Sequence, residues 1–244
     1  ARTLRGRGSM MGDVRTEVVP AEAFGEAAAG AFMELCARHG TEPLVGLATG
    51  NTPTTMYLTL AARGVGGTRA VAVDEYVGPR EHACSNRAYF RSYWEPLAGA
   101  SGVEQFDPGA ADLGQECERV AAAIAAGGGL DLAVLGIGLN GHLAFNEPGS
   151  DRDCPARVVE LHQESRTAAA GCWGSDTPTH GMTLGLRELL GAKSVLLLAN
   201  RGAKAAIVAR ALQGKVGPEC PASWLQGHSD LRVVLDEAAA RYLR

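Results

Sequence analysis

The chain has 244 residues, of which 46% are hydrophobic and 20% charged, so it can bury a sizeable core. Its formal net charge of −4 argues against nucleic acid as a partner, because binding to phosphate backbones needs a concentrated basic surface. No apolar stretch approaches the roughly 18 residues that span a bilayer, and no signal peptide is evident. We therefore expect a cytoplasmic protein with no membrane partner.

The cysteines are widely spaced and include no C-x-x-C pair, which is typical of reduced thiols in a cytoplasmic protein. They are Cys36, Cys84, Cys117, Cys154, Cys172 and Cys220. Residues 1–9 precede Met10 and Met11 and look like a vector-derived leader, so they are excluded from the expected fold. Residues 10–244 are expected to form a single domain.

Short apolar segments alternate with amphipathic segments of helical length, a pattern typical of buried strands covered by crossover helices. The predicted strands are Pro43 to Leu47, Ala70 to Val73, Leu130 to Leu135, Ser194 to Ala199 and Leu231 to Leu235. The predicted helices lie around Phe24–Leu35, Met56–Leu60, Arg87–Leu97, Cys117–Ile124 and Ile207–Leu212. The sequence therefore predicts an α/β fold: an open, mostly parallel, Rossmann-like sheet with helices on both faces.

The segment from Gly46 to Pro53 (GLATGNTP) follows the first predicted strand and opens a helix. Thr52 can cap that helix and Pro53 suits its first turn, which leaves free N–H groups and hydroxyls beside the positive helix end. Such a loop suits a phosphate, although a strand-to-helix turn of this composition is often only a turn. The candidate anion-binding residues are Thr49, Gly50, Asn51 and Thr52.

Asp74 and Glu75 are adjacent carboxylates at the end of the second predicted strand. Strand carboxyl ends face the ligand crevice in open α/β sheets. A partly desolvated carboxylate there has a raised pKa and can take a proton from carbon. The alternative is a solvated strand end that caps a helix. The acidic pair is therefore a candidate for a base.

The segment from Gly136 to Pro148 (GIGLNGHLAFNEP) follows the third predicted strand and carries the strongest signal. Its glycines let the backbone approach a ligand, and His142 and Glu147 can meet if the turn folds back. A carboxylate beside an imidazole fixes the tautomer and suits it to proton transfer near neutral pH. A lone loop histidine is usually just exposed, but together with Asn140 these residues form a candidate acid–base site.

Lys204 opens a helix after the strand from Ser194 to Ala199. An ammonium beside a helix N-terminus gains nothing from the helix dipole unless an anion bridges the two. A phosphate would explain this position. The ordinary alternative is a solvated surface lysine.

Residues 148–179 carry Gly, Ser, Asp and Pro without a clear period. Irregular stretches of this length in a compact domain are often functional loops. We expect an irregular lid here, with a tolerated surface excursion as the alternative.

The segments GLATGNTP, VAVDEYVG, GIGLNGHLAFNEPGS and GMTLGL, followed by a strand and GAK, together resemble the glucosamine-6-phosphate deaminase family, also called glucosamine-6-phosphate isomerase. The resemblance extends over nearly the whole chain beyond the leader, and DEYVG with GHLAFNEPG is its most specific part. It implies an enzyme that converts glucosamine 6-phosphate to fructose 6-phosphate and ammonia without a metal or nicotinamide cofactor. The related 6-phosphogluconolactonases differ at both places.

The resemblance also implies roles for individual residues. Asp74 is similar to the family's proton-transfer base and His142 to its ring-opening acid/base, with Glu147 and Asn140 orienting the imidazole. The positions that match the family's substrate-phosphate site are Thr49, Gly50, Asn51, Thr52 and Lys204.

One segment departs from the family pattern. Members commonly carry an arginine that contacts the sugar phosphate after the position of Ser165 and Arg166, but this chain reads TAAAGCWGSD there. The resemblance therefore implies an altered lid, and it predicts the reaction class more firmly than the substrate.

Three alternatives stay open. The chain can act on another amino-sugar phosphate, it can be a 6-phosphogluconolactonase in which His142 activates water, or it can be a sugar-phosphate-sensing module without catalysis. In each case the expected partner is a small-molecule sugar phosphate, and the expected assembly is a monomer or a small homo-oligomer. The chain also ends soon after its last predicted strand, without the tail of the allosteric hexameric members, so we expect no amino-sugar allostery.

Overall fold

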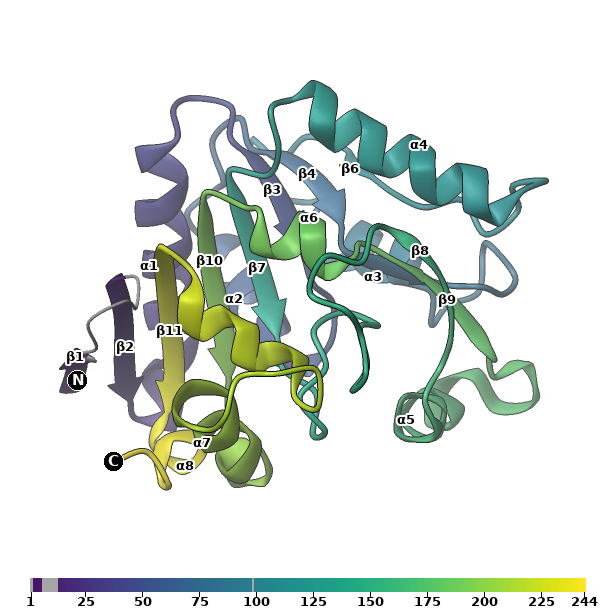
Figure 1. The fold of residues 1–244 in the computed structure, drawn as a ribbon. Coiled ribbons are helices and arrows are strands. Elements are labelled where there is room, and N and C mark those ends of the chain that lie inside the picture. The colour runs from purple at the N-terminus through teal and green to yellow at the C-terminus, as the bar shows by residue number, and fades with distance from the viewer. Residues whose placement is uncertain (1, 6–12, 98) are drawn as a thin grey trace.

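The computed structural model describes residues 2–5, 13–97 and 99–244. Its centre is an eight-stranded sheet in the order β1-β2-β11-β10-β7-β3-β4-β6 (Figure 1), in which only β1 and β2 pair antiparallel. The strands are β1 (Arg2–Arg5), β2 (Asp13–Val19), β3 (Leu44–Leu47), β4 (Arg69–Ala72), β6 (Val103–Glu104), β7 (Leu132–Gly136), β10 (Ser194–Ala199) and β11 (Asp230–Asp236). The open, mostly parallel sheet expected from the sequence is confirmed.

Helices cover both faces of this sheet. One face carries α1 (Phe24–Arg38), α2 (Asn51–Leu60) and α3 (Asn86–Tyr93). The other carries α4 (Leu113–Ala126), α6 (Leu186–Leu190), α7 (Ala205–Gln213) and α8 (Glu237–Ala240). Short 3-10 turns are η1 (Ala21–Ala23), η2 (Gly174–Asp176), η3 (Gly202–Lys204) and η4 (Pro221–Gly227). The molecule is therefore a three-layer α/β/α arrangement.

The two faces of the sheet hold two separate cores because successive side chains of a strand point to opposite faces. In β10, Leu196 and Leu198 join the cluster under α1 and α2, while Val195 and Leu197 join the cluster under α6 and η4. All six residues of β10 are buried, which explains why this strand appears in the sequence as one continuous apolar run.

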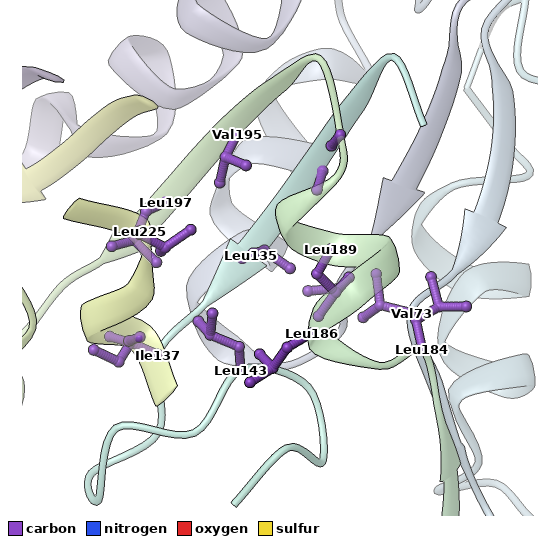
Figure 2. Close-up of a cluster of buried hydrophobic side chains, with 14 of the residues drawn as sticks. Val73, Leu135, Ile137, Leu143, Leu184, Leu186, Leu189, Val195, Leu197 and Leu225 are labelled. Carbon is purple, nitrogen blue, oxygen red and sulfur yellow. The ribbon is translucent and has the colours of Figure 1, made fainter. Parts of the chain in front are cut away.

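The second core also anchors the loop that follows β7. Figure 2 shows Ile137 and Leu143, which flank that loop, among the buried side chains of this core. Leu143 is fully buried, and burying a side chain of this size contributes about 1.5–3 kcal/mol. The packing therefore fixes both ends of the segment that carries His142.

A second, three-stranded antiparallel sheet lies beside the main one, in the order β5-β9-β8. It consists of β5 (Asp74–Tyr76), β9 (His180–Thr183) and β8 (Arg157–Glu160), and α5 (Gln163–Trp173) connects β8 to β9 (Figure 1). The prediction of irregular structure over residues 148–179 is thus wrong for much of this range. The buried residues of α5 are Ser165, Ala169 and Trp173, of which only the last is large and apolar, so the sequence shows no strong helical pattern there.

The cysteines differ in part from the expectation. Cys84 and Cys172 form a disulfide, with their Cα atoms 6.0 Å apart, so the prediction of six reduced thiols is wrong for this pair. The sequence could not reveal it, because the two residues are separated by 88 positions and meet only when α5 folds against the loop before α3. The free cysteines are Cys36, Cys117, Cys154 and Cys220.

All five predicted strands and all five predicted helices are present, with ends shifted by a few residues. Residues 2–5, which fell within the excluded leader, form β1 and pair with β2, and β2 itself was missed. Within the described ranges, no helix combines the length and the apolar character needed to cross a bilayer. Sequence patterning thus located the central strands best.

Candidate active site

Loops after β3, β4, β7 and β10 line one cavity of about 470 Å³. β3 and β7 are neighbours, but β3 leads through α2 to β4 on one side, whereas β7 leads on to β10 on the other. Ligands bind in open α/β sheets at such switch points, outside the carboxyl ends of the strands. The predicted site residues on the cavity wall are Thr49, Gly50, Asn51, Thr52, Asp74, His142 and Lys204.

Asp74 begins β5 and is only 8% exposed. Burial raises the pKa of its carboxyl to about 7, helped by the neighbouring Glu75 charge and opposed by a hydrogen bond from Asn86. The Asn86 amide donates to Asp74 Oδ1 at 2.6 Å and to the Asp74 carbonyl at 2.9 Å. A carboxylate with this pKa can both accept and return a proton near neutral pH.

Glu75 has a structural task instead. It accepts hydrogen bonds from the backbone N–H groups of Asn86 and Arg87 at the start of α3, at 2.9 and 2.8 Å, and from the N–H of Tyr76. Burial raises its pKa, and these bonds oppose that rise. The helix-capping explanation, considered above for the acidic pair, therefore describes Glu75.

Asn86 is a site residue that the sequence argument missed. Besides holding Asp74, its side-chain oxygen accepts a hydrogen bond from the Thr49 hydroxyl at 3.0 Å. It thus ties the β3 loop to the candidate base. A Ser–Asn pair before a helical segment is typical of a helix start, and Ser85 caps α3 by accepting from the Ala88 N–H.

His142 and Glu147 meet as the sequence predicted. His142 Nδ1 lies 3.2 Å from Glu147 Oε2, and Ser165 from α5 donates to Glu147 Oε1 at 2.6 Å. Burial opposes ionisation of Glu147. The hydrogen bond and charge of His142, together with the hydrogen bonds from Ser165 and Asn140, outweigh this effect and lower the pKa of Glu147 to about 2. Glu147 is therefore ionised, and its carboxylate fixes the orientation of the His142 imidazole through Nδ1.

Asn140 does not line the cavity but hydrogen-bonds the residues that form the acid–base pair. Its amide donates to Glu147 Oε2 at 2.7 Å, and its oxygen accepts from the backbone N–H of His142 at 3.1 Å. Asn140 therefore holds the loop and the carboxylate, and Glu147 makes the contact with the imidazole. Gly138 completes the arrangement, because a Cβ there would lie 2.3 Å from the His142 ring.

The β3 loop differs in one detail from the expectation. α2 is capped by Gly50, whose φ of 100° favours glycine, so the prediction that Thr52 caps the helix is wrong. Thr52 instead donates its hydroxyl to Asn200 Oδ1 at 2.9 Å, linking α2 to the end of β10. The first N–H groups of α2 have no partner within the helix and open onto the cavity, as an anion site requires.

Two basic side chains line the same end of the cavity. Lys204 donates to the Ile137 carbonyl, and burial, with the nearby Arg201 charge, lowers the pKa of its ammonium. Arg201 was not singled out from the sequence. It has φ 74° and ψ 142°, a region that costs a residue other than glycine about 1–3 kcal/mol.

The other wall of the cavity comes from α5, through Glu164, Ser165 and Ala168. No lysine or arginine of α5 is among the described residues on this wall. The far end of α5 is held by Trp173, which stacks on His82 with 4.0 Å between ring centroids and also contacts Tyr76.

A family model described as glucosamine-6-phosphate isomerases/6-phosphogluconolactonase matches residues 16–234. The chain belongs to this family. A glucosamine-6-phosphate deaminase of Streptomyces avermitilis is 40% identical, with 93% of this chain and 92% of that protein covered. One of Rhodopirellula baltica is 36% identical, with 94% and 96% covered. The family resemblance drawn from the motifs is confirmed.

Solved structures agree with the fold. A monomeric glucosamine-6-phosphate deaminase of the NagB superfamily superimposes with a TM-score of 0.87 at 30% identity, covering 95% of this chain and 99% of the other. The 6-phosphogluconolactonase of Trypanosoma brucei gives a TM-score of 0.75 at 21% identity over 97% and 100%. The second likeness shows the fold alone.

Proposed function

We propose that this chain converts glucosamine 6-phosphate and water to fructose 6-phosphate and ammonia. The observation that carries the proposal is one cavity lined by a carboxyl with a pKa of about 7 and by an imidazole backed by an anionic glutamate. Deaminases at 36–40% identity over more than nine-tenths of the chain support the same reaction.

The substrate phosphate binds between the start of α2 and Lys204. Unpartnered N–H groups and the positive end of the helix dipole attract an anion there, and the ammonium adds a full charge. Thr49, Gly50, Asn51 and Thr52 provide this loop. Fixing the phosphate at one end orients the sugar toward the end of β5 and the loop after β7.

His142 opens the sugar ring. Its imidazole takes the proton of the anomeric hydroxyl and delivers a proton to the ring oxygen, which yields the open-chain aldehyde. Glu147 Oε2 at 3.2 Å from Nδ1 fixes the ring orientation and stabilises the protonated form. Asn140 and Ser165 hold that carboxylate in place.

Asp74 then moves the proton on carbon. Its carboxylate removes the proton from C2, the electron pair of that C–H bond forms the C1=C2 bond, and the C1=O π electrons move to O1, which takes a proton from solvent to give an enolamine. Returning the proton to C1 gives an imine at C2, and water adds to this carbon and expels ammonia. Burial serves this step because a carboxylate with a raised pKa is a stronger base toward carbon.

The test is to mix the purified protein with glucosamine 6-phosphate and to measure ammonia and fructose 6-phosphate together. We expect equal amounts of both products. Absence of turnover at high enzyme concentration would reject the substrate. Parallel reactions with other hexosamine 6-phosphates and with 6-phosphogluconolactone test the open alternatives, because lactone hydrolysis needs no base for C2.

The proposal extends to the setting of the enzyme. We propose a cytoplasmic enzyme that acts as a monomer or a small homo-oligomer on a free sugar phosphate. The related deaminase of known structure is described as monomeric. The Cys84–Cys172 disulfide runs against the cytoplasmic part of the proposal, because that compartment keeps most thiols reduced.

A further inference from the structure

The phosphate end of the cavity needs more positive charge than Lys204 supplies. A phosphate monoester carries a charge of about −1.5 to −2 at pH 7. Among the described residues of the cavity wall, α5 contributes Glu164, Ser165 and Ala168 and no cation, so this wall does not offset the phosphate charge. Positive charge beyond Lys204 and the start of α2 therefore has to come from another element.

Arg201 is held at the cavity by its backbone. Its N–H donates to Asp236 Oδ2 at 2.8 Å, and Asp236 is itself only 4% exposed and caps α8 through a bond from the Ala239 N–H. The residue keeps a φ of 74°, where glycine would fit without strain. An arginine kept in a strained backbone conformation on a pocket wall indicates that its side chain has a function there.

The guanidinium is available for a ligand. Among the side chains that the structure describes, no carboxylate forms an ion pair with Arg201. The residue is exposed and lines the cavity, and its charge is close enough to lower the pKa of Lys204, although burial has the larger effect. An anion between these two neighbouring cations would relieve their mutual repulsion and bind to both.

We propose that Arg201 binds the substrate phosphate together with Lys204, supplying from the β10–α7 turn a guanidinium to a cavity wall to which α5 contributes no cation. The inference rests on the proposed function for the identity of the substrate, but the anion it requires is the phosphate group itself. A guanidinium can bind two phosphate oxygens at once, whereas the Lys204 ammonium acts as a point charge.

Arg201→Gly is the decisive variant, because glycine adopts φ 74° freely and the fold is therefore retained. We expect KM for glucosamine 6-phosphate to rise about 10- to 100-fold, because the loss of hydrogen bonds between charged groups weakens binding by a factor of this size. We expect kcat to change less than about threefold, because the phosphate lies away from the reacting carbons. Arg201→Lys keeps the charge without the planar fork, and we expect an intermediate KM.

Arg241→Ala is the matched control. This arginine lies beside Gly202 and against the Tyr242 ring, and it does not line the cavity. Its removal takes the same charge from the same region, so a general electrostatic effect would appear in both variants. We expect KM in Arg241→Ala to stay within about twofold of the parent value.

Calorimetric titration with inorganic phosphate separates this inference from the proposed function. Binding at least tenfold weaker in Arg201→Gly than in the parent supports the phosphate contact, whether or not the parent releases ammonia from glucosamine 6-phosphate. Equal phosphate affinity in parent and Arg201→Gly overturns the assignment of Arg201, even if the parent is a fully active deaminase. Equal loss in Arg241→Ala overturns it as well.

Discussion

The two walls of the cavity are built differently. On one wall, Asp74, His142 and Lys204 come after β4, β7 and β10 of the main sheet. Backbone hydrogen bonds of that sheet and the two buried cores on its faces fix these segments, so we call this the sheet-supported wall. The opposite wall is α5, which stands beside a three-stranded sheet and is tied back by a disulfide and a tryptophan stack. We therefore propose that the chemistry belongs to the sheet-supported wall and that α5 shapes access to it.

The largest effect is expected from Asp74→Asn on the sheet-supported wall. Asparagine keeps the shape and still accepts the Asn86 hydrogen bond, but it cannot take a proton from C2. We expect kcat to fall by about 10²–10⁴-fold in the ammonia assay. Phosphate affinity by calorimetry should match the parent, and retained activity would exclude Asp74 as the base.

The same variant has a stability signature. Because the folded-state pKa of Asp74 lies near 7, above its unfolded value, ionisation of this buried group destabilises the fold as pH rises through that value. Asp74→Asn should therefore be more stable than the parent at pH 8, by at most about 4 kcal/mol, with the advantage lost toward pH 4. Urea unfolding at the two pH values measures this difference, and an equal difference at both would contradict the pKa shift.

Glu147→Gln tests the link between the walls, since Glu147 contacts both His142 and Ser165 of α5. The neutral amide no longer stabilises a protonated imidazole, so we expect kcat/KM to fall about 10- to 100-fold. Ser165→Ala is the control from the α5 side, with an expected loss of less than about fivefold because His142 and Asn140 still hold the carboxylate. Equal losses would place α5 in the chemistry.

Asn86→Ala is expected to have a smaller effect with a distinct pH signature. The Asn86 hydrogen bond lowers the pKa of Asp74, so its removal raises that pKa and shifts the acid limb of the kcat/KM profile to higher pH. We expect about a tenfold loss at pH 7 that is partly recovered at pH 8.5. A loss of the same size at every pH would mean that Asn86 serves only the fold.

The two walls also differ in how well they could be predicted from the sequence. The loops after β3, β7 and β10 follow continuous apolar strands, so Thr49, His142 and Lys204 could be placed at one sheet edge from local patterns alone. The helix α5 and the Cys84–Cys172 bond depend on contacts between distant segments, which no local period records. Asn86 and Arg201 were missed because an asparagine at the start of a helix and an arginine in a turn are ordinary at those places.

Removing the disulfide should affect the chemistry least. In the double variant Cys84→Ser/Cys172→Ser we expect kcat within about threefold of the parent, because the sheet-supported wall is untouched. The free energy of unfolding should fall by about 2–4 kcal/mol, since the bond closes a loop of 88 residues. Denaturant unfolding and the ammonia assay check both. A tenfold loss of kcat would assign α5 a direct part in the reaction.

The pH dependence of deuterium loss from C2 of C2-deuterated glucosamine 6-phosphate, counted both in the solvent and at C1 of the product, tests the central claim most directly, because it reports the proton step on carbon. The account predicts that this rate falls as pH decreases through about 7, where the Asp74 carboxylate becomes protonated, and that in Asp74→Asn almost no deuterium leaves C2. A parent rate that stays constant from pH 8 to pH 5 would contradict a base with this pKa.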